Sequence, residues 1–68
     1  MDAQTFKQEY GIEESEAVAV AAGTNYAYFH QIATGHRRPS IELAEALVAA
    51  SGGRLDLVAL LKSKKTAA

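Results

Sequence analysis

The sequence predicts an all-α fold, a compact bundle of five short helices in one domain over residues 1–62, with a disordered tail over 63–68. Three observations support this prediction. The 68 residues suffice for a single small domain. The segments between the glycines are rich in Ala, Leu, Glu, Gln and Lys, which favour helices. No segment is a convincing strand, because the best candidate, AVAVAA at 17–22, is dominated by alanine.

Glycines and the single proline, Pro39, divide the chain into these helices. Asn25 and Ser40 stand where a side-chain oxygen can accept a hydrogen bond from a free backbone N–H at the start of a helix. Gly23 stands where a left-handed residue commonly ends a helix. The predicted helices span about 2–9, 14–22, 26–34, 41–51 and 55–62.

Apolar residues mark an inward face on each of the first four helices. Phe6 and Tyr10 lie one turn apart and therefore share a face. Phe29 and Ile32 also share a face, which leaves the other side of their helix polar. The remaining residues expected to face the core are Val18, Ala19, Ala22, Ile41, Ala44, Leu47 and Val48.

The last helix is apolar on more than one face, which indicates burial on more than one side. In so short a chain, the second side is expected to contact another subunit. The alternative is that the helix is tucked into the core with one leucine left exposed. The residues assigned to this dimer interface are Leu55, Leu57, Val58, Leu60 and Leu61.

Length and composition disfavour several functions. A chain of this size buries only about 60% of the surface that it exposes when unfolded, so a catalytic cleft is not expected. Without cysteine there is no disulfide or cysteine-ligated zinc, and His30 and His36 alone do not indicate a metal site. The N-terminus lacks the features of a secretory signal. We therefore expect a cytoplasmic protein that is not an enzyme and uses no cofactor, metal, small-molecule ligand or membrane.

The charge is unevenly distributed, although the net charge is only −1. Residues 1–34 hold five acidic residues and one lysine, a net charge of −4. Residues 35–68 hold six basic and three acidic residues, a net charge of +3. Such asymmetry can mark a basic face that binds nucleic acid, and it is equally compatible with an ordinary solvated surface.

Ala19, Gly23 and Phe29 have the spacing of a helix-turn-helix. A small residue lets two helices cross closely, and a glycine four residues later permits positive φ in a tight turn. A large apolar residue six positions further on then holds the second helix against the first. We therefore predict a helix-turn-helix over about residues 15–34.

The segment SEAVAVAAGTNYAYFHQIATG resembles the helix-turn-helix of the phage Cro and repressor superfamily and of Cro-like antitoxin regulators. GHRRPS followed by a helix, and then GGRL, extend the resemblance to about residues 14–61. It implies a lambda-repressor-like fold and a sequence-specific transcriptional regulator, such as a Cro-like repressor of phage or bacterial origin. Such a regulator binds a pseudo-palindromic double-stranded DNA operator as a homodimer, with the second helix of the motif in the major groove.

The resemblance also implies which residues contact DNA. Gln31 would bind adenine through two hydrogen bonds, and His30 would donate to guanine N7 or to a phosphate. Ala27 would contact a thymine methyl group, and Tyr26 a phosphate or a base edge. The outward set at these positions is Asn25, Tyr26, Ala27, His30, Gln31 and Thr34.

Further residues would contact the DNA backbone. Tyr28 lies nearer the flank and would contact a phosphate or pack against the next helix. In the following loop, His36, Arg37 and Arg38 would neutralise phosphates. At the start of the motif, Ser15 and its neighbouring backbone N–H groups would hold another phosphate.

Two positions depart from the family pattern. Many relatives have Gln at the start of the motif, where this chain has Ser15 between Glu14 and Glu16, and many have a small polar residue in place of Tyr26. The operator sequence therefore cannot be transferred from a relative. The alternative hypothesis is an antitoxin or accessory protein that uses the same fold to bind a protein partner.

Overall fold

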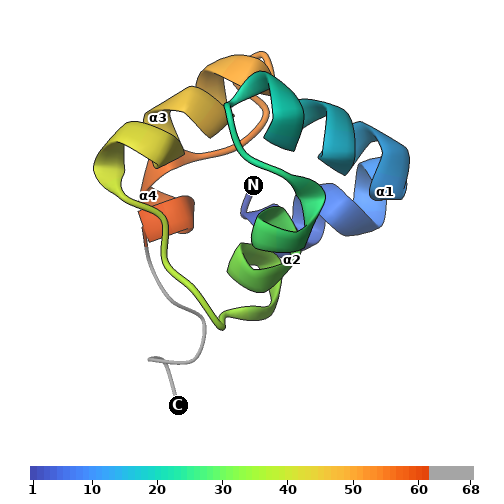
Figure 1. Cartoon of the computed structure of the whole chain (residues 1–68), viewed down its shortest axis with the longest axis horizontal. Helices are drawn as coiled ribbons and strands as arrows, with labels where there is room; N and C mark the ends of the chain where they lie inside the picture. The colour runs from blue at the N-terminus through green and yellow to red at the C-terminus, as the bar shows by residue number, and fades with distance from the viewer. Residues whose placement is uncertain (62–68) are drawn as a thin grey trace.

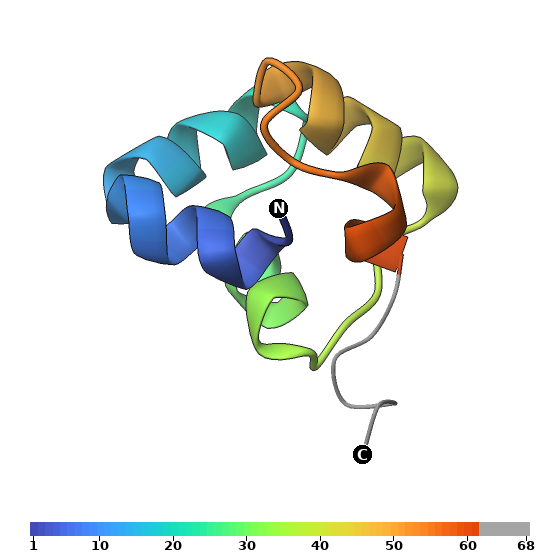
Figure 2. The ribbon, with the colours of Figure 1, turned by 180° about the vertical axis from the view of Figure 1, so that it is seen from behind.

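The computed structural model describes residues 1–61, and in that range the chain is all-helical, as predicted. The helices surround one core (Figures 1 and 2). The tail predicted for 63–68 lies outside the described residues. No helix in the described range has the length and apolar content needed to cross a bilayer. The four helices are α1 (Ala3–Ala21), α2 (Tyr26–Thr34), α3 (Ile41–Ala50) and α4 (Leu57–Leu61).

The prediction of five helices is wrong, because the first two of them form the single element α1. Gly11 interrupts this element with φ 90° and ψ 177°, a backbone conformation that is essentially restricted to glycine. The two halves of α1 lie at an angle to each other (Figure 2). The chain therefore bends at the expected glycine, but no loop separates the two halves.

The bend lets both halves of α1 pack against α2. From the first half, the Phe6 ring centre lies 4.7 Å from that of Tyr10 and 6.1 Å from that of Phe29. From the second half, Ala19 is fully buried. Phe29 and Ile32 are both in the core, as predicted. The core thus holds α2 by its apolar face.

A short connection joins α1 to α2. Gly23 has the predicted positive φ, at 91°, and the next N–H, that of Thr24, donates to Ala19 O at 2.9 Å. Asn25 is the N-cap of α2, as predicted, because its Oδ1 accepts from Tyr28 N at 2.9 Å. These bonds fix the angle at which the chain enters α2.

α3 also begins at its predicted cap, where Ser40 Oγ accepts from Leu43 N at 3.1 Å. Ala44 and Leu47 are fully buried, in agreement with the sequence. Ile41 was expected to face the core, but it is 61% exposed. The reason is that the core does not extend to the first residue of this helix.

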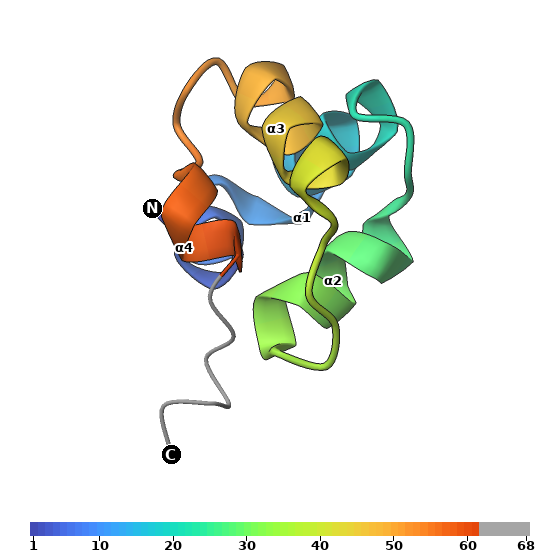
Figure 3. The same ribbon diagram turned by 90° about the vertical axis from the view of Figure 1, so that its left-hand side faces the viewer.

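The last helix begins at Leu57, two residues later than predicted, and its predicted end at residue 62 lies outside the described residues. Leu55 and Leu60 are each 2% exposed, and Leu57 and Leu61 pack partly against the core. The assignment of Leu55 and Leu60 to a dimer interface is therefore wrong, since neither offers surface to a second subunit. Val58 is the exposed member of the predicted set, at 57%. α4 packs against α3 (Figure 3), and the segment just before it is joined to the N-terminus, where Asp56 N donates to Met1 O at 2.9 Å.

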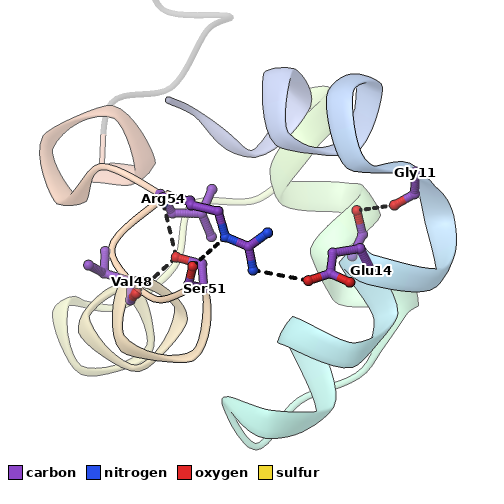
Figure 4. Close-up of polar contacts among 7 residues, drawn as sticks. Gly11, Glu14, Val48, Ser51 and Arg54 are labelled. Carbon is purple, nitrogen blue, oxygen red and sulfur yellow. Dashed lines mark hydrogen bonds and ion pairs between the residues drawn. The ribbon is translucent and has the colours of Figure 1, made fainter.

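Arg54, between α3 and α4, links three parts of the chain (Figure 4). Its guanidinium donates to Glu14 Oε2 at 3.0 Å and to Ser51 O at 2.6 Å. The guanidinium carbon lies 5.0 Å from the Phe6 ring centre and 4.6 Å from that of Tyr10, within the range of cation–π contacts. The hydrogen bond to Glu14 raises the pKa of Arg54 above its usual value, because the neighbouring carboxylate favours the charged guanidinium.

Replacing Ser51 by alanine is expected to lower the free energy of unfolding by about 1–3 kcal/mol. Ser51 is fully buried, and its Oγ donates to Val48 O at 2.8 Å and accepts from Leu55 N at 3.0 Å. The substitution leaves a buried N–H without an acceptor. Urea denaturation measures the loss, and hydrogen exchange at the Leu55 amide should accelerate. Ser40→Ala is the control, because it removes a cap at an exposed position and leaves the Leu55 amide hydrogen-bonded. Exchange at Leu55 that accelerates no more in Ser51→Ala than in Ser40→Ala would contradict this account.

Candidate functional site

α2 has two chemically different faces, as the sequence predicts. One face is apolar and buried, whereas the other carries an imidazole, an amide and two phenols. Because the buried face packs on both halves of α1, the polar groups stand on a firmly held element. The buried face consists of Phe29, Ile32 and Ala33; on the other face Ala27, His30 and Gln31 are exposed, and Tyr26, Tyr28 and Thr34 are partly exposed.

Two predicted contact residues at the start of α2 have internal partners. Asn25 is exposed, but its Oδ1 already accepts the capping bond, so its amide hydrogens are what it can offer to a partner. Tyr26 has its ring centre 6.0 Å from that of His30. The phenol and the imidazole therefore lie on the same side of α2.

Lys7 is a functional candidate that the sequence did not reveal. It belongs to the first half of α1, and its Nζ lies 3.1 Å from Nδ1 of His30. The two residues are 23 positions apart in the chain. No periodicity or motif connects residues at that separation, and the contact exists because the bend at Gly11 brings the first half of α1 against α2. The bend thus adds a cation to the exposed face of α2.

Gln31 and Arg37 are bonded to each other. The Nε of Arg37 donates to Oε1 of Gln31 at 2.8 Å. The guanidinium carbon of Arg37 also lies 5.7 Å from the centre of the Tyr28 ring, at cation–π distance. Tyr28 therefore supports an arginine at the end of the polar face, and the terminal nitrogens of Arg37 remain available to an anion.

The loop after α2 is fixed by backbone bonds. Gly35 is the C-cap of α2, and the N–H groups of His36 and Arg37 donate to Gln31 O at 2.9 and 3.2 Å. The hydroxyl of Thr34 lies 2.7 Å from Nδ1 of His36. Both arginines and His36 are exposed. The structure thus brings the predicted residues of this loop beside the polar face of α2.

Ser15 does not join this group, and its predicted phosphate contact through the hydroxyl is wrong. The residue is fully buried, and its Oγ donates to Gly11 O at 2.8 Å. A signal for this burial exists in the sequence. Ser15 precedes Ala19 by four residues, so it lies on the same inward face of the helix.

The charge around α2 is positive. No carboxylate occurs between Glu16 and Glu42, a stretch that contains α2 and both arginines of the following loop. Lys7 approaches from α1. Glu14 is paired with Arg54 instead, at 3.0 Å. The exposed face of α2 therefore has a local excess of positive charge, although the net charge of the whole chain is slightly negative.

Within residues 1–61, no group of three or more His, Asp and Glu side chains is arranged to hold a metal ion. Comparison of the chain with models of protein families, with characterised proteins and with solved structures gives no match.

Proposed function

We propose that the protein is a sequence-specific DNA-binding regulator that places α2 in the major groove. The observation that carries this proposal is the exposed face of α2, where hydrogen-bonding side chains stand among cations. His30 and Gln31 are exposed on the helix, and Lys7 and Arg37 are bonded to them. Base edges in the major groove are read by side chains of this kind.

The packing of α2 suits insertion into DNA. The major groove is about 12 Å wide and admits one α-helix. Phe29, Ile32 and Ala33 are buried on one face of α2, and His30 and Gln31 are exposed on the other, where they could enter the groove. In this proposal the second half of α1 and α2, joined by the turn at Gly23, form a helix-turn-helix of the Cro-like type.

The cations would contact the backbone of the DNA. Arg37 rests on Tyr28, and Arg38 is exposed beside it. Guanidinium groups bind phosphates through paired hydrogen bonds. Few such cations are present, so the salt dependence of binding should be moderate for a DNA-binding protein.

In this proposal the protein acts as a homodimer on a pseudo-palindromic operator. The two copies of α2 would then lie about 34 Å apart, one helical turn of DNA. Occupancy of a promoter would exclude polymerase and repress transcription. Sedimentation analysis with and without DNA tests the dimer, and a complex of one protein chain with a duplex that carries both half-sites would contradict it.

Gln31 and Arg37 share a hydrogen bond, and substituting each in turn should distinguish contacts with bases from contacts with the DNA backbone. Gln31→Ala is expected to reduce discrimination at one base pair by about 1–3 kcal/mol. Arg37→Ala is expected to weaken binding to operator and scrambled duplexes and to lower the salt slope by about one. Because it also removes the hydrogen bond to Gln31 Oε1, the salt slope, and not the base preference, is the readout of its phosphate contact. Fluorescence anisotropy with operator and scrambled duplexes measures both effects.

Arg37→Lys is the matched control for charge, since it should retain most of the salt slope. If neither alanine substitution altered duplex binding, α2 would not be the DNA-reading element.

The second candidate is a protein-interaction module of the antitoxin or accessory type. It is favoured by the net charge of −1 and by exposed aliphatic residues, which include Ile12, Val20, Ile41 and Val58. Salt separates the two functions. DNA binding should weaken as salt rises from about 50 to 200 mM, with the moderate slope expected for few phosphate contacts, whereas an apolar protein contact should hardly respond.

A further inference from the structure

Two exposed side chains of α2 are each hydrogen-bonded to a basic side chain. Lys7 Nζ lies 3.1 Å from His30 Nδ1, and Arg37 Nε lies 2.8 Å from Gln31 Oε1. An ammonium group and a guanidinium group carry donors and no acceptor. The atom that each of them contacts must therefore accept a hydrogen bond. This requirement fixes the tautomer of His30 and the orientation of the Gln31 side-chain amide.

For His30 the contact fixes the tautomer. A neutral imidazole has one accepting nitrogen and one N–H. Because Nδ1 accepts from Lys7, the ring proton is on Nε2. His30 therefore presents a donor at the end of the ring that points away from the lysine contact.

For Gln31 the contact fixes the orientation of the amide. Its Oε1 accepts from Arg37, which leaves Nε2 with two hydrogens and, within residues 1–61, no partner of its own. The backbone oxygen of Gln31 is also occupied, by the N–H groups of His36 and Arg37. Gln31 therefore offers DNA two free amide hydrogens, whereas its acceptor Oε1 is shared with Arg37.

We propose that Lys7 and Arg37 fix His30 and Gln31 as hydrogen-bond donors, so that α2 selects guanine in the major groove. The inference rests on the proposed DNA-binding function and names the base that this function reads. Guanine presents two acceptors in the major groove, N7 and O6, whereas adenine presents an acceptor beside the N6 donor. A two-bond contact between Gln31 and adenine needs Oε1 as acceptor, and Arg37 competes for that atom.

The tautomer of His30 is measurable without DNA. Ring ¹⁵N shifts, recorded at about pH 8.5 where an ordinary imidazole is neutral, should show the Nε2–H form for His30. Lys7→Met should release the ring into a mixture of tautomers, and Lys7→Arg should retain the Nε2–H form because it also donates. His36 is the internal control, since its Nδ1 contacts Thr34 and should not respond. An Nδ1–H form in the wild type, or no response to Lys7→Met, overturns the inference.

The base preference is measured by selection of duplexes from a random-sequence DNA pool. The enriched half-site should contain guanines, and 7-deazaguanine at the contacted positions, which removes the N7 acceptor, should weaken binding about tenfold. Arg37→Met should lower the ratio of guanine to adenine preference about tenfold, because it frees Gln31 Oε1. Arg37→Lys is the control that keeps the charge and a donor.

The two proposals fail in different ways. Adenine at the contacted positions, or a preference ratio unchanged in Arg37→Met, overturns the guanine inference and leaves the DNA-binding function standing. A random pool from which no duplex is enriched, with no salt-dependent duplex binding by the wild type, overturns both.

Discussion

Replacing Phe29 by alanine is expected to remove a large part of the free energy of unfolding of this domain. The Phe29 ring is fully buried and contacts Phe6 across the core. Removal of a buried phenylalanine side chain costs about 3–5 kcal/mol. The whole free energy of unfolding of a domain of this size is about 3–10 kcal/mol, so the substitution removes a large part of it. Far-ultraviolet circular dichroism and urea denaturation measure the effect.

His30→Ala is the control for this experiment, because it changes the same helix on its exposed face. Its unfolding midpoint should stay close to that of the wild type. If Phe29→Ala instead retained a cooperative transition with a similar midpoint, the attachment of α2 to α1 would not depend on this ring.

Replacing Gly11 by alanine is expected to cost about 1–3 kcal/mol of stability. No atom lies within 4 Å of the position that the new Cβ would take. The cost therefore comes from the backbone alone, whose φ of 90° and ψ of 177° an alanine resists. If α1 straightens in response, Lys7 is drawn away from His30. The measurements are urea denaturation and the ring ¹⁵N shifts of His30.

Gly52→Ala is the matched control, since it adds the same methyl group where no atom lies within 4 Å. Its φ of 68° is close to the left-handed helical region, which an alanine tolerates better. Equal costs at the two glycines would show that the bend in α1 is not what makes Gly11 necessary.

Local features of the fold could be predicted from the sequence. Asn25 and Ser40 were identified as caps because a cap depends on residues three positions away. Phe29 and Ile32 were placed in the core because helical periodicity decides which side of a short helix is apolar. The burial of Ser15 follows from the same periodicity, but the hydroxyl suggested an exposed role.

Features that depend on distant residues could not be predicted. The contact of Lys7 with His30 spans 23 residues, and that of Glu14 with Arg54 spans 40. The number of helices depended on the dihedral angles of Gly11, which composition does not reveal. The excess of leucine near the C-terminus suggested a second subunit, but Leu55 and Leu60 are covered by the chain itself.

The contacts of Arg54 have a consequence for the order of events during folding. Caps and helical turns form between residues close in sequence, so they close quickly and at little entropic cost. The guanidinium reaches back across 40 residues to Glu14, and closing so long a segment is entropically more costly. The rings of Phe6 and Tyr10 must also be positioned before the Arg54 guanidinium can form its cation–π contacts with them. The contacts of Arg54 are therefore expected to form after the rate-limiting step of folding. They should lower the unfolding rate more than they raise the folding rate.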